Sequence, residues 1–481
     1  MRTIGNTPVD GEVRAVASGA LANGDTVVVN SDGTVSVVAA SGGPPSVGSP
    51  VVFETADSYF MGSSYDPINN KVVIAYADGG NSNRPTAVVG SVSGDSISFG
   101  TAVVITTQTS LDTGAVSIVF DSNAEKVILA FHLSSANDGS AIVGTISGTS
   151  ISFGTLVDFD TNGGDEPSLA FDSSNNKIVV VYRDSGTSNY GKARVGTVSG
   201  TSISFGSEVV FASAYTGWPS VTFDSNSNKI VIAYYSSTTT GAAIVGTVSG
   251  TSISFGTAVN FITGGNAQNN KIVFDSANNK VVIVFNYSTD YSANAVVGTV
   301  SGTSITFGGV TTFSSGNSSI QSATFDSSNN LVVCTYRGNA ASYYGTVAAG
   351  TVSGTSITFG TPIVYNTNNT QYSSIVFDSS SNQNIISYRD GGNSNYGTAL
   401  VYSSSSSNLT SENYIGLAKG AAADGTSAVI QTGCSINDAQ SGLTAGQKYY
   451  VQNDGSLVTT AADPSVFAGT AVSATKLIVK G

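Results

Sequence analysis

The amino-acid sequence repeats itself, and this constrains the fold more than any other feature. An aromatic residue followed by Asp, at the start of a polar turn, recurs at intervals of 55, 51, 52, 51, 51 and 52 residues. The seven aspartates are Asp66, Asp121, Asp172, Asp224, Asp275, Asp326 and Asp378. A unit of this length cannot bury its apolar face alone, so such repeats stack on their neighbours. We therefore expect one array of similar units.

Each unit has the composition of short β-strands joined by tight turns. A second marker, Ser-Gly-Thr-Ser-Ile-Ser/Thr-Phe-Gly, falls between the aspartates and ends at Gly100 (where Asp95 replaces Thr), Gly154, Gly206, Gly256, Gly308 and Gly360. In one copy, strands are expected at 168–171, 177–182, 193–198 and 201–211. Four strands per roughly 50 residues are typical of a propeller blade. The sequence predicts an all-β fold, a seven-bladed β-propeller of four-stranded blades.

The count of markers predicts how the ring closes. Seven copies of the first marker accompany only six of the second, so one outer strand is missing from the last copy. Residues 47–53, Val-Gly-Ser-Pro-Val-Val-Phe, are similar to the segments that cross each blade junction. We predict that residues 46–53 supply the outer strand of blade seven, which would pair the first and last blades and remove an exposed edge.

Charge and composition exclude several classes of function. Only 10% of residues are charged, the net charge is −13 and the pI is about 4.3, which disfavours binding to a phosphate backbone. No apolar stretch approaches the ~20 residues of a membrane span, so we expect no membrane insertion. Cys334 and Cys434 are too few for a disulfide framework or a zinc cluster. We expect no nucleic acid partner, no metal and no cofactor.

Outside the repeats, two segments match one another. Residues 21–35 align with residues 443–457, each with a Gly-containing turn, a strand, an Asp-Gly hairpin turn and another strand. The two ends of the chain could pack into one accessory β-module or form separate ones. We expect an amino-terminal β segment at 1–45, the propeller at 46–402, a Ser-rich linker at 403–412 and a carboxy-terminal β-module at 413–481.

The carboxy-terminal segment carries a family resemblance. Residues 413–418, 443–451 and 468–479 resemble small β-modules at the ends of bacteriophage virion proteins, tail-fibre-like or other particle-surface proteins of the marine-phage type. This resemblance implies a structural protein of the virion, oligomeric on the particle, with other virion proteins as partners and with capsid or tail location left open. The absence of a secretory apolar run after Met1 agrees with assembly in the host cytoplasm.

The loops at one end of the predicted blades vary strongly between copies, whereas the Asp turns and the Ser-Gly-Thr-Ser turns at the other end barely change. Variable loops on a rigid scaffold are where binding usually resides. Aromatic faces stack on sugar rings, and Arg and Asp form hydrogen bonds to hydroxyls and carboxylates. The candidate ligand-binding residues are Tyr59, Phe60, Arg183, Asp184, Tyr215, Trp218, Arg337, Arg389 and Asp390. Their ligand would be a host-surface polysaccharide or another virion protein.

Catalysis has weaker support in the sequence. His132 is the sole imidazole, at a position that holds Ala, Arg, Tyr or Asn in other copies. Asp160, Asp165 and Glu166 fall in one variable loop and could pair for glycoside cleavage. The repeated Asp residues fold their own turns better than they would hold calcium. We predict a non-enzymatic protein without catalytic residues; a bacterial adhesin or lectin-like protein and a glycan hydrolase or lyase remain alternatives.

Overall fold

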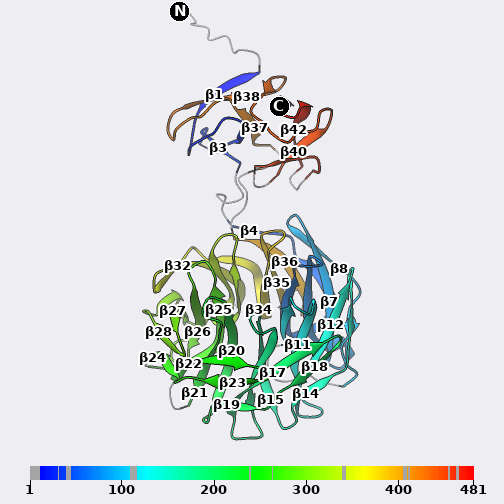
Figure 1. Cartoon of the computed structure of the whole chain (residues 1–481), viewed down its shortest axis with the longest axis vertical. Helices are drawn as coiled ribbons and strands as arrows, with labels where there is room; N and C mark the ends of the chain where they lie inside the picture. Colours follow the sequence, from blue (N-terminus) through cyan, green and yellow to red (C-terminus); the bar gives the residue numbers. More distant parts are fainter. Residues whose placement is uncertain are drawn as a thin grey trace, which may run out of the picture. The chain divides into compact units, whose positions relative to one another are not determined.

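The computed structural model describes residues 11–30, 32–38, 45–108, 116–237, 240–262, 264–338, 343–404, 409, 412–452, 455–461 and 465–480. They form two compact units. One contains residues 47–404, and the other combines the described parts of 1–46 and 405–481 (Figure 1). Of the predicted linker at 403–412, residues 405–408, 410 and 411 lie outside the described residues.

The described residues of the larger unit form seven antiparallel blades, which confirms the predicted fold. Each blade has three full strands and an outer strand in two short pieces. The first four blades comprise the second half of β5 (Val51–Asp66) with β6 (Lys71–Asp78), β7 (Arg84–Ser93), β8 (Ser96–Phe99) and β9 (Val103–Val104); β10 (Ser117–Asp121), β11 (Lys126–Leu133), β12 (Asp138–Ser147), β13 (Ser150–Phe153) and β14 (Val157–Asp160); β15 (Gly164–Asp172), β16 (Lys177–Asp184), β17 (Tyr190–Ser199), β18 (Ser202–Phe205) and β19 (Val209–Ala212); and β20 (Thr216–Asp224), β21 (Lys229–Ser236), β22 (Thr240–Ser249), β23 (Ser252–Phe255) and β24 (Val259–Ile262).

The remaining blades follow the same pattern. They comprise β25 (Ala267–Asp275), β26 (Lys280–Tyr287), β27 (Ala293–Ser301), β28 (Ser304–Phe307) and β29 (Thr311–Ser314); β30 (Ser319–Asp326), β31 (Leu331–Arg337), β32 (Tyr344–Ser353), β33 (Ser356–Phe359) and the first part of β34 (Ile363–Asp378); and the rest of β34 with β35 (Gln383–Asp390), β36 (Tyr396–Ser403), β4 (Ser46–Val47) and the start of β5. The single strand predicted at 201–211 is thus two strands, β18 and β19.

The break in the outer strand has a steric cause. The Gly206 amide donates to the Val195 carbonyl at 2.9 Å, which keeps the chain next to β17. A Cβ at Gly206 would lie 1.9 Å from the carbonyl oxygen of Thr251, in the Ser-Gly-Thr-Ser turn of the next blade. Only glycine allows this close approach. The glycine of the repeated Phe-Gly marker is therefore required by the contact between neighbouring blades.

The ring closes as predicted. Val51 and Val52 pair with Ala399 and Thr398 of β36, and further along the same strand Asp66 pairs with Lys71 of β6. The Gly48 amide donates to the Val401 carbonyl at 2.8 Å, which repeats the Gly206 contact at the closing position. β36 accordingly contacts β8 of the first blade (Figure 1). β5 therefore belongs to both the last and the first blade.

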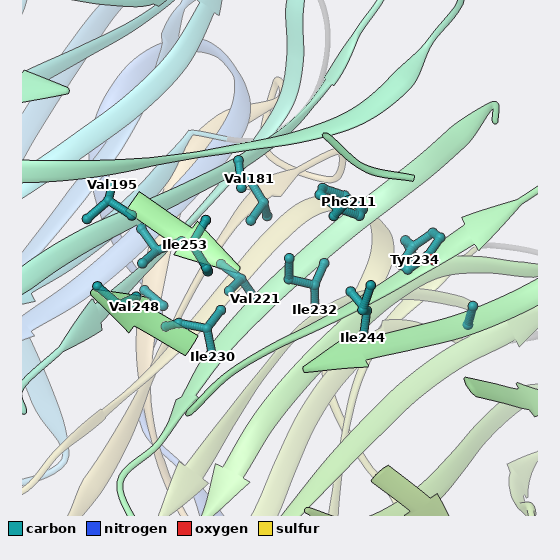
Figure 2. Close-up of a cluster of buried hydrophobic side chains, with 14 residues drawn as sticks. Val181, Val195, Phe211, Val221, Ile230, Ile232, Tyr234, Ile244, Val248 and Ile253 are labelled. Carbon is teal, nitrogen blue, oxygen red and sulfur yellow. The ribbon is translucent and has the colours of Figure 1, made fainter. Parts of the chain in front are cut away.

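Apolar packing between neighbouring blades forms the core. Figure 2 shows one such layer, in which Val181, Val195 and Phe211 of one blade pack against Ile230, Ile232, Tyr234 and Ile244 of the next. The middle strand β16 is buried on both faces from Ile178 to Tyr182. This explains why the second strand of each repeat is a continuous apolar run instead of an alternating one.

The repeated aspartates fold their own turns, as the sequence predicts. In all seven copies the side-chain Oδ1 accepts the backbone N–H groups two and three residues later, at 2.8–3.2 Å. These bonds satisfy backbone donors that the turn would otherwise leave unpaired.

Both ends of the chain belong to the second unit, whereas the sequence left open whether they form one module or two. One sheet has the order β1 (Glu12–Val16), β38 (Ser427–Gln431), β37 (Tyr414–Ala418), β2 (Thr26–Val29) and β3 (Val35–Val37), and the other has the order β39 (Ile436–Asn437), β43 (Lys476–Val479), β42 (Val466–Ser473), β40 (Lys448–Val451) and β41 (Leu457–Val458). Val28 packs in one core with Leu443 and Leu477. The ends therefore form a single module.

Helical structure is limited, within the described residues, to the 3-10 turn η1 (Gly79–Asn81). No described helix has the length and apolar character needed to cross a membrane.

A truncation tests ring closure. Removing residues 1–53 deletes the segment that pairs with β36, including Phe53, which packs against the rings of Tyr76 and Phe99 at 5.2 and 5.4 Å. We expect the free energy of unfolding of the propeller to fall by at least about 3 kcal/mol. Chemical denaturation followed by the fluorescence of Trp218 measures it. The control lacks only residues 1–45, so it disrupts the second unit equally but keeps the closing strand. Equal stability of the two truncated chains would contradict the closure.

Candidate functional site

All nine predicted site residues lie at one end of the blades, the end that carries the variable loops. These loops join second to third strands, as at 185–189, and outer strands to the next first strands, as at 213–215. We call this end the variable face. The Asp turns lie at the opposite end.

An aromatic cluster occupies the variable face where the last blade meets the first. Phe60 lies 5.0 Å from Tyr372, and Tyr59 lies 5.9 Å from Tyr372, between ring centroids. The guanidinium of Arg389 lies 4.9 Å from the ring of Tyr59 and forms two hydrogen bonds with the Asp57 carboxylate, at 2.6 and 2.9 Å. Tyr59 also donates its hydroxyl to Asp57 at 2.6 Å. The structure thus brings Tyr59, Phe60 and Arg389 together.

A second cluster lies across the third and fourth blades. Arg183 contacts Asp165 at 3.2 Å and Glu166 at 3.1 Å, and it donates to the hydroxyl of Tyr215 at 3.2 Å. The backbone N–H of Trp218 donates to the other Glu166 oxygen at 2.7 Å. Arg183, Tyr215 and Trp218 are therefore neighbours, and two carboxylates from the start of β15 hold Arg183 in place.

Three arginines share one structural role. Arg183, Arg337 and Arg389 occupy the same repeat position near the end of the second strand, directly after a buried tyrosine. Each guanidinium lies over a tyrosine ring, at 5.7 Å for Tyr215, 4.8 Å for Tyr343 and 4.9 Å for Tyr59. A cation over an aromatic face is attracted by the ring quadrupole and restricts the ring. The arginines therefore orient the tyrosines on the variable face.

Large aromatic residues on this face have a left-handed backbone conformation. In the first strands, φ is 53° at Phe60, 47° at Trp218 and 54° at Tyr372, whereas the same position holds Glu166 (φ 50°) in the third blade and Asn269 in the fifth. In the loops before the third strands, Tyr291 and Tyr343 have φ of 53° and 55°, where other copies have Asn83, Asn137, Asn189 and Asn395. Asn adopts this conformation more readily than bulky residues, so the aromatic residues store strain.

Asp184 and Asp390 have structural partners. Asp184 is buried and forms an ion pair with Lys192, which also contacts Glu208 at 2.7 Å. Asp390 accepts hydrogen bonds at 3.0 Å from the Asn366 amide and from the backbone of Gly392, and so closes its own turn.

Among the described residues, one group of carboxylates has a spacing suited to a metal ion, Asp160, Asp184 and Glu208, with oxygens within 4.8 Å of one another. The ammonium of Lys192 contacts two of the three and supplies the compensating charge. Burial raises the pKa of Asp160, whereas hydrogen bonds from Lys192 and Thr187 outweigh the opposite effect of burial and lower that of Asp184. The group is an ion-pair network where the second blade meets the third.

The three carboxylates that the sequence places in one variable loop separate in space. Asp160 belongs to the Lys192 network, whereas Asp165 and Glu166 contact Arg183. His132 is buried, with its Nε2 3.5 Å from an Asp165 oxygen. Burial raises the pKa of Glu166, and Arg183 offsets part of this effect.

Sequence reasoning missed Tyr291, Tyr343 and Tyr372 as components of this face. The signal was present: at positions aligned by the repeat, Tyr291 and Tyr343 replace the Asn found in four other copies, and Tyr372 aligns with Phe60 and Trp218.

Comparison with known proteins addresses the fold. No protein-family model matches the sequence, and no curated protein matches it. Among solved structures, the chain is similar to the BP39L lectin from Burkholderia pseudomallei, with a TM-score of 0.55 and 12% identity over 74% of this chain and 98% of the lectin. At that identity the likeness shows a shared fold. A leech intramolecular trans-sialidase (TM-score 0.43, 10% identity, 73% of this chain and 69% of that one) and AofleA from Arthrobotrys oligospora (0.41, 10%, 70% and 93%) align more loosely.

Removing the guanidinium of Arg389 tests the first cluster. Burial alone would raise the pKa of Asp57, but hydrogen bonds from Arg389 and Tyr59 outweigh it and hold the pKa below the ordinary value of 3.8. A lowered carboxyl pKa stabilises the fold above the unfolded pKa, and the gain disappears as the pH falls through the folded pKa. Arg389→Gln should therefore cost about 1–2 kcal/mol at pH 7 and progressively less below pH 3.8.

Denaturant titrations across this pH range measure the effect. Arg14→Gln, at an exposed position of the second unit, is the control for loss of one positive charge. A deficit that stays constant from pH 7 down to pH 2 would contradict the ion pair with Asp57.

Proposed function

We propose that the protein is a non-enzymatic glycan-binding component of a bacteriophage particle, with the variable face of the propeller as its binding surface. The observation that carries the binding role is the strained set of aromatic residues, Phe60, Trp218, Tyr291, Tyr343 and Tyr372; Tyr291 and Tyr343 occupy a position where four other copies have Asn. Strain of this kind persists where the surrounding structure enforces it, and it concentrates at binding sites.

The exposed rings are the contact groups of this proposal. Tyr215, Tyr291 and Tyr343 are 39, 50 and 46% exposed. Rigid aromatic rings offer a large apolar face at low entropic cost, which suits the C–H face of a sugar. Arg183 and Arg389 already bond to carboxylates, so they position the rings, and the tyrosine hydroxyls supply polar contacts.

The setting on a phage particle is supported by the resemblance of residues 413–418, 443–451 and 468–479 to virion end-modules. It is also supported by the architecture. The two chain ends combine in one unit distinct from the propeller, so attachment to a particle and binding of a glycan can reside in separate units. Other virion proteins would contact the unit of the chain ends, and copies would assemble on the particle. A lectin-like adhesin would use the same variable face without that attachment.

Glycoside cleavage on the same face is a second candidate, favoured by the raised pKa of Glu166, a property that a general acid needs. If the protein only binds glycans, incubation of the wild-type chain with host polysaccharide should release no reducing ends. Release that Glu166→Gln abolishes would replace the binding role with a hydrolytic one.

Substitution of the strained tyrosines tests glycan binding. Tyr291→Asn and Tyr343→Asn introduce the residue that other copies use, so the fold should keep its stability. On a glycan array, each variant should bind about ten-fold more weakly than wild type, equivalent to the loss of about 1.4 kcal/mol. Ile68→Ala, at an exposed position in an Asp turn at the opposite end, is the matched control. Wild-type levels of binding in both tyrosine variants would contradict the role of this face.

The position of the protein on the phage particle tests its proposed structural role. Antibody raised against the purified chain and labelled with gold should bind intact phage particles at fixed positions, on tail or capsid. Particles that carry the chain's gene but never bind the antibody, while the lysate does, would contradict the structural role and favour a separate lectin.

A further inference from the structure

A cavity of about 250 Å³ lies on the axis of the ring, where the first strands of all seven blades meet. At one repeat position, four residues before each turn Asp, the lining residues are Gly62, Ser117, Ser168, Ser220, Lys271, Ser322 and Ser374. Apolar groups also line it, among them Met61, Pro167 and the single tryptophan, Trp218.

Four of these serines link neighbouring blades by a hydrogen bond to the backbone. Each Oγ accepts a backbone N–H from the first strand of the next blade: Ser117 from Leu169 at 2.9 Å, and Ser168, Ser220 and Ser322 from Val221, Ile272 and Ile375 at 3.2 Å. A serine hydroxyl has one hydrogen to donate as well as its acceptor lone pairs. Because these oxygens already accept from the backbone, their hydrogens can donate to an acceptor in the cavity.

Lys271 departs from this pattern. A lysine cannot accept a backbone N–H, so this link is absent between the fifth and sixth blades. Asn286 makes the connection instead, accepting from Ile320 N–H at 2.7 Å and donating to the Ser318 carbonyl at 3.1 Å. Lys271 therefore does not make the bond between blades that serine makes at this position in other copies.

The ammonium of Lys271 also lacks a counter-charge in contact. Among the described residues it has no hydrogen-bond or salt-bridge partner, whereas Lys192 contacts two carboxylates. Burial lowers the pKa of Lys271, and the nearby Glu166 offsets only part of this effect. Glu166 itself contacts Arg183 and the Trp218 N–H, so its charge is already shared. An uncompensated ammonium in such an environment gains most from an anion.

The lining selects among anions. A phosphate with two negative charges would be repelled by the Glu166 carboxylate. Among the lining residues, only the ammonium of Lys271 could compensate those charges. A carboxylate carries a single charge and accepts hydrogen bonds at two oxygens, which matches one lysine and neighbouring serine hydroxyls. The apolar lining and Trp218 suit the carbon frame to which that carboxylate is attached.

We propose that the axial cavity binds a carboxylate on a hydroxylated, otherwise uncharged carbon frame, held by Lys271. Two sources share this chemistry: a free sugar acid, or an acidic sugar residue of a glycan. The second source rests on the proposed glycan binding at the variable face, whereas the first does not.

Trp218 reports directly on the cavity. Titration of the full chain with sodium glucuronate at pH 7 should change the Trp218 fluorescence to saturation, and glucose at the same concentrations should not. Lys271→Ser, which restores the residue found in five other blades, should weaken glucuronate binding at least ten-fold and leave the melting temperature unchanged or higher. Lys280→Ser, at a partly exposed position beside an Asp turn, controls for loss of positive charge.

A glucuronate-terminated oligosaccharide and its glucose-terminated counterpart distinguish the sources. Binding of the free acid alone identifies a solute site, and Lys271-dependent preference for the acidic oligosaccharide identifies a glycan site; either outcome supports the proposal. No response to either acid, equal binding of glucose, or unchanged binding by Lys271→Ser would overturn it. Loss of neutral glycan binding in Tyr343→Asn reports on the variable face independently, so the two proposals can fail separately.

Discussion

Face-to-face packing of neighbouring blades is the interaction on which the structure depends. A single blade has two apolar faces and a middle strand buried on both, such as Ile178–Tyr182 in β16, so it cannot be stable alone. Close approach at Gly206 brings the next blade within reach, and β5 extends the same contact from the last blade to the first. With the ring closed, β5 completes the last blade, and the first and last blades cover each other's apolar faces.

The closed ring gives each repeat position a fixed place in space. Residues four before each turn Asp surround the axis, and residues after each second strand reach the variable face. When one copy has an unusual residue at a repeat position, that residue therefore lies in the same ring as the common residues of the other copies. Lys271 among serines and Tyr343 among asparagines are departures of this kind. Because the scaffold is satisfied by the commoner residue, the rarer one points to a role beyond folding.

Part of the candidate site could be predicted from the sequence. The equivalence of Arg183, Arg337 and Arg389 is visible in the repeat, and the structure gives each arginine a tyrosine partner. Their carboxylate partners were not predictable, since Asp57 lies 332 residues from Arg389 in the chain and meets it only through ring closure. Asp184 and Asp390 look alike in Arg-Asp pairs, yet one is buried against Lys192 and the other closes an exposed turn.

The sequence by itself determined the repeat number, the strands, the Asp turns and the closing segment, because each depends on residues a few positions apart or on a period of roughly 50 residues. Tertiary structure alone decided that both chain ends share one module, that the outer strands break at glycine, and that Lys271 shares a cavity with Glu166. Those outcomes depend on which surfaces and charges meet across blades. Local pattern carries no information about such distant pairings, since their energies arise only after the ring has formed.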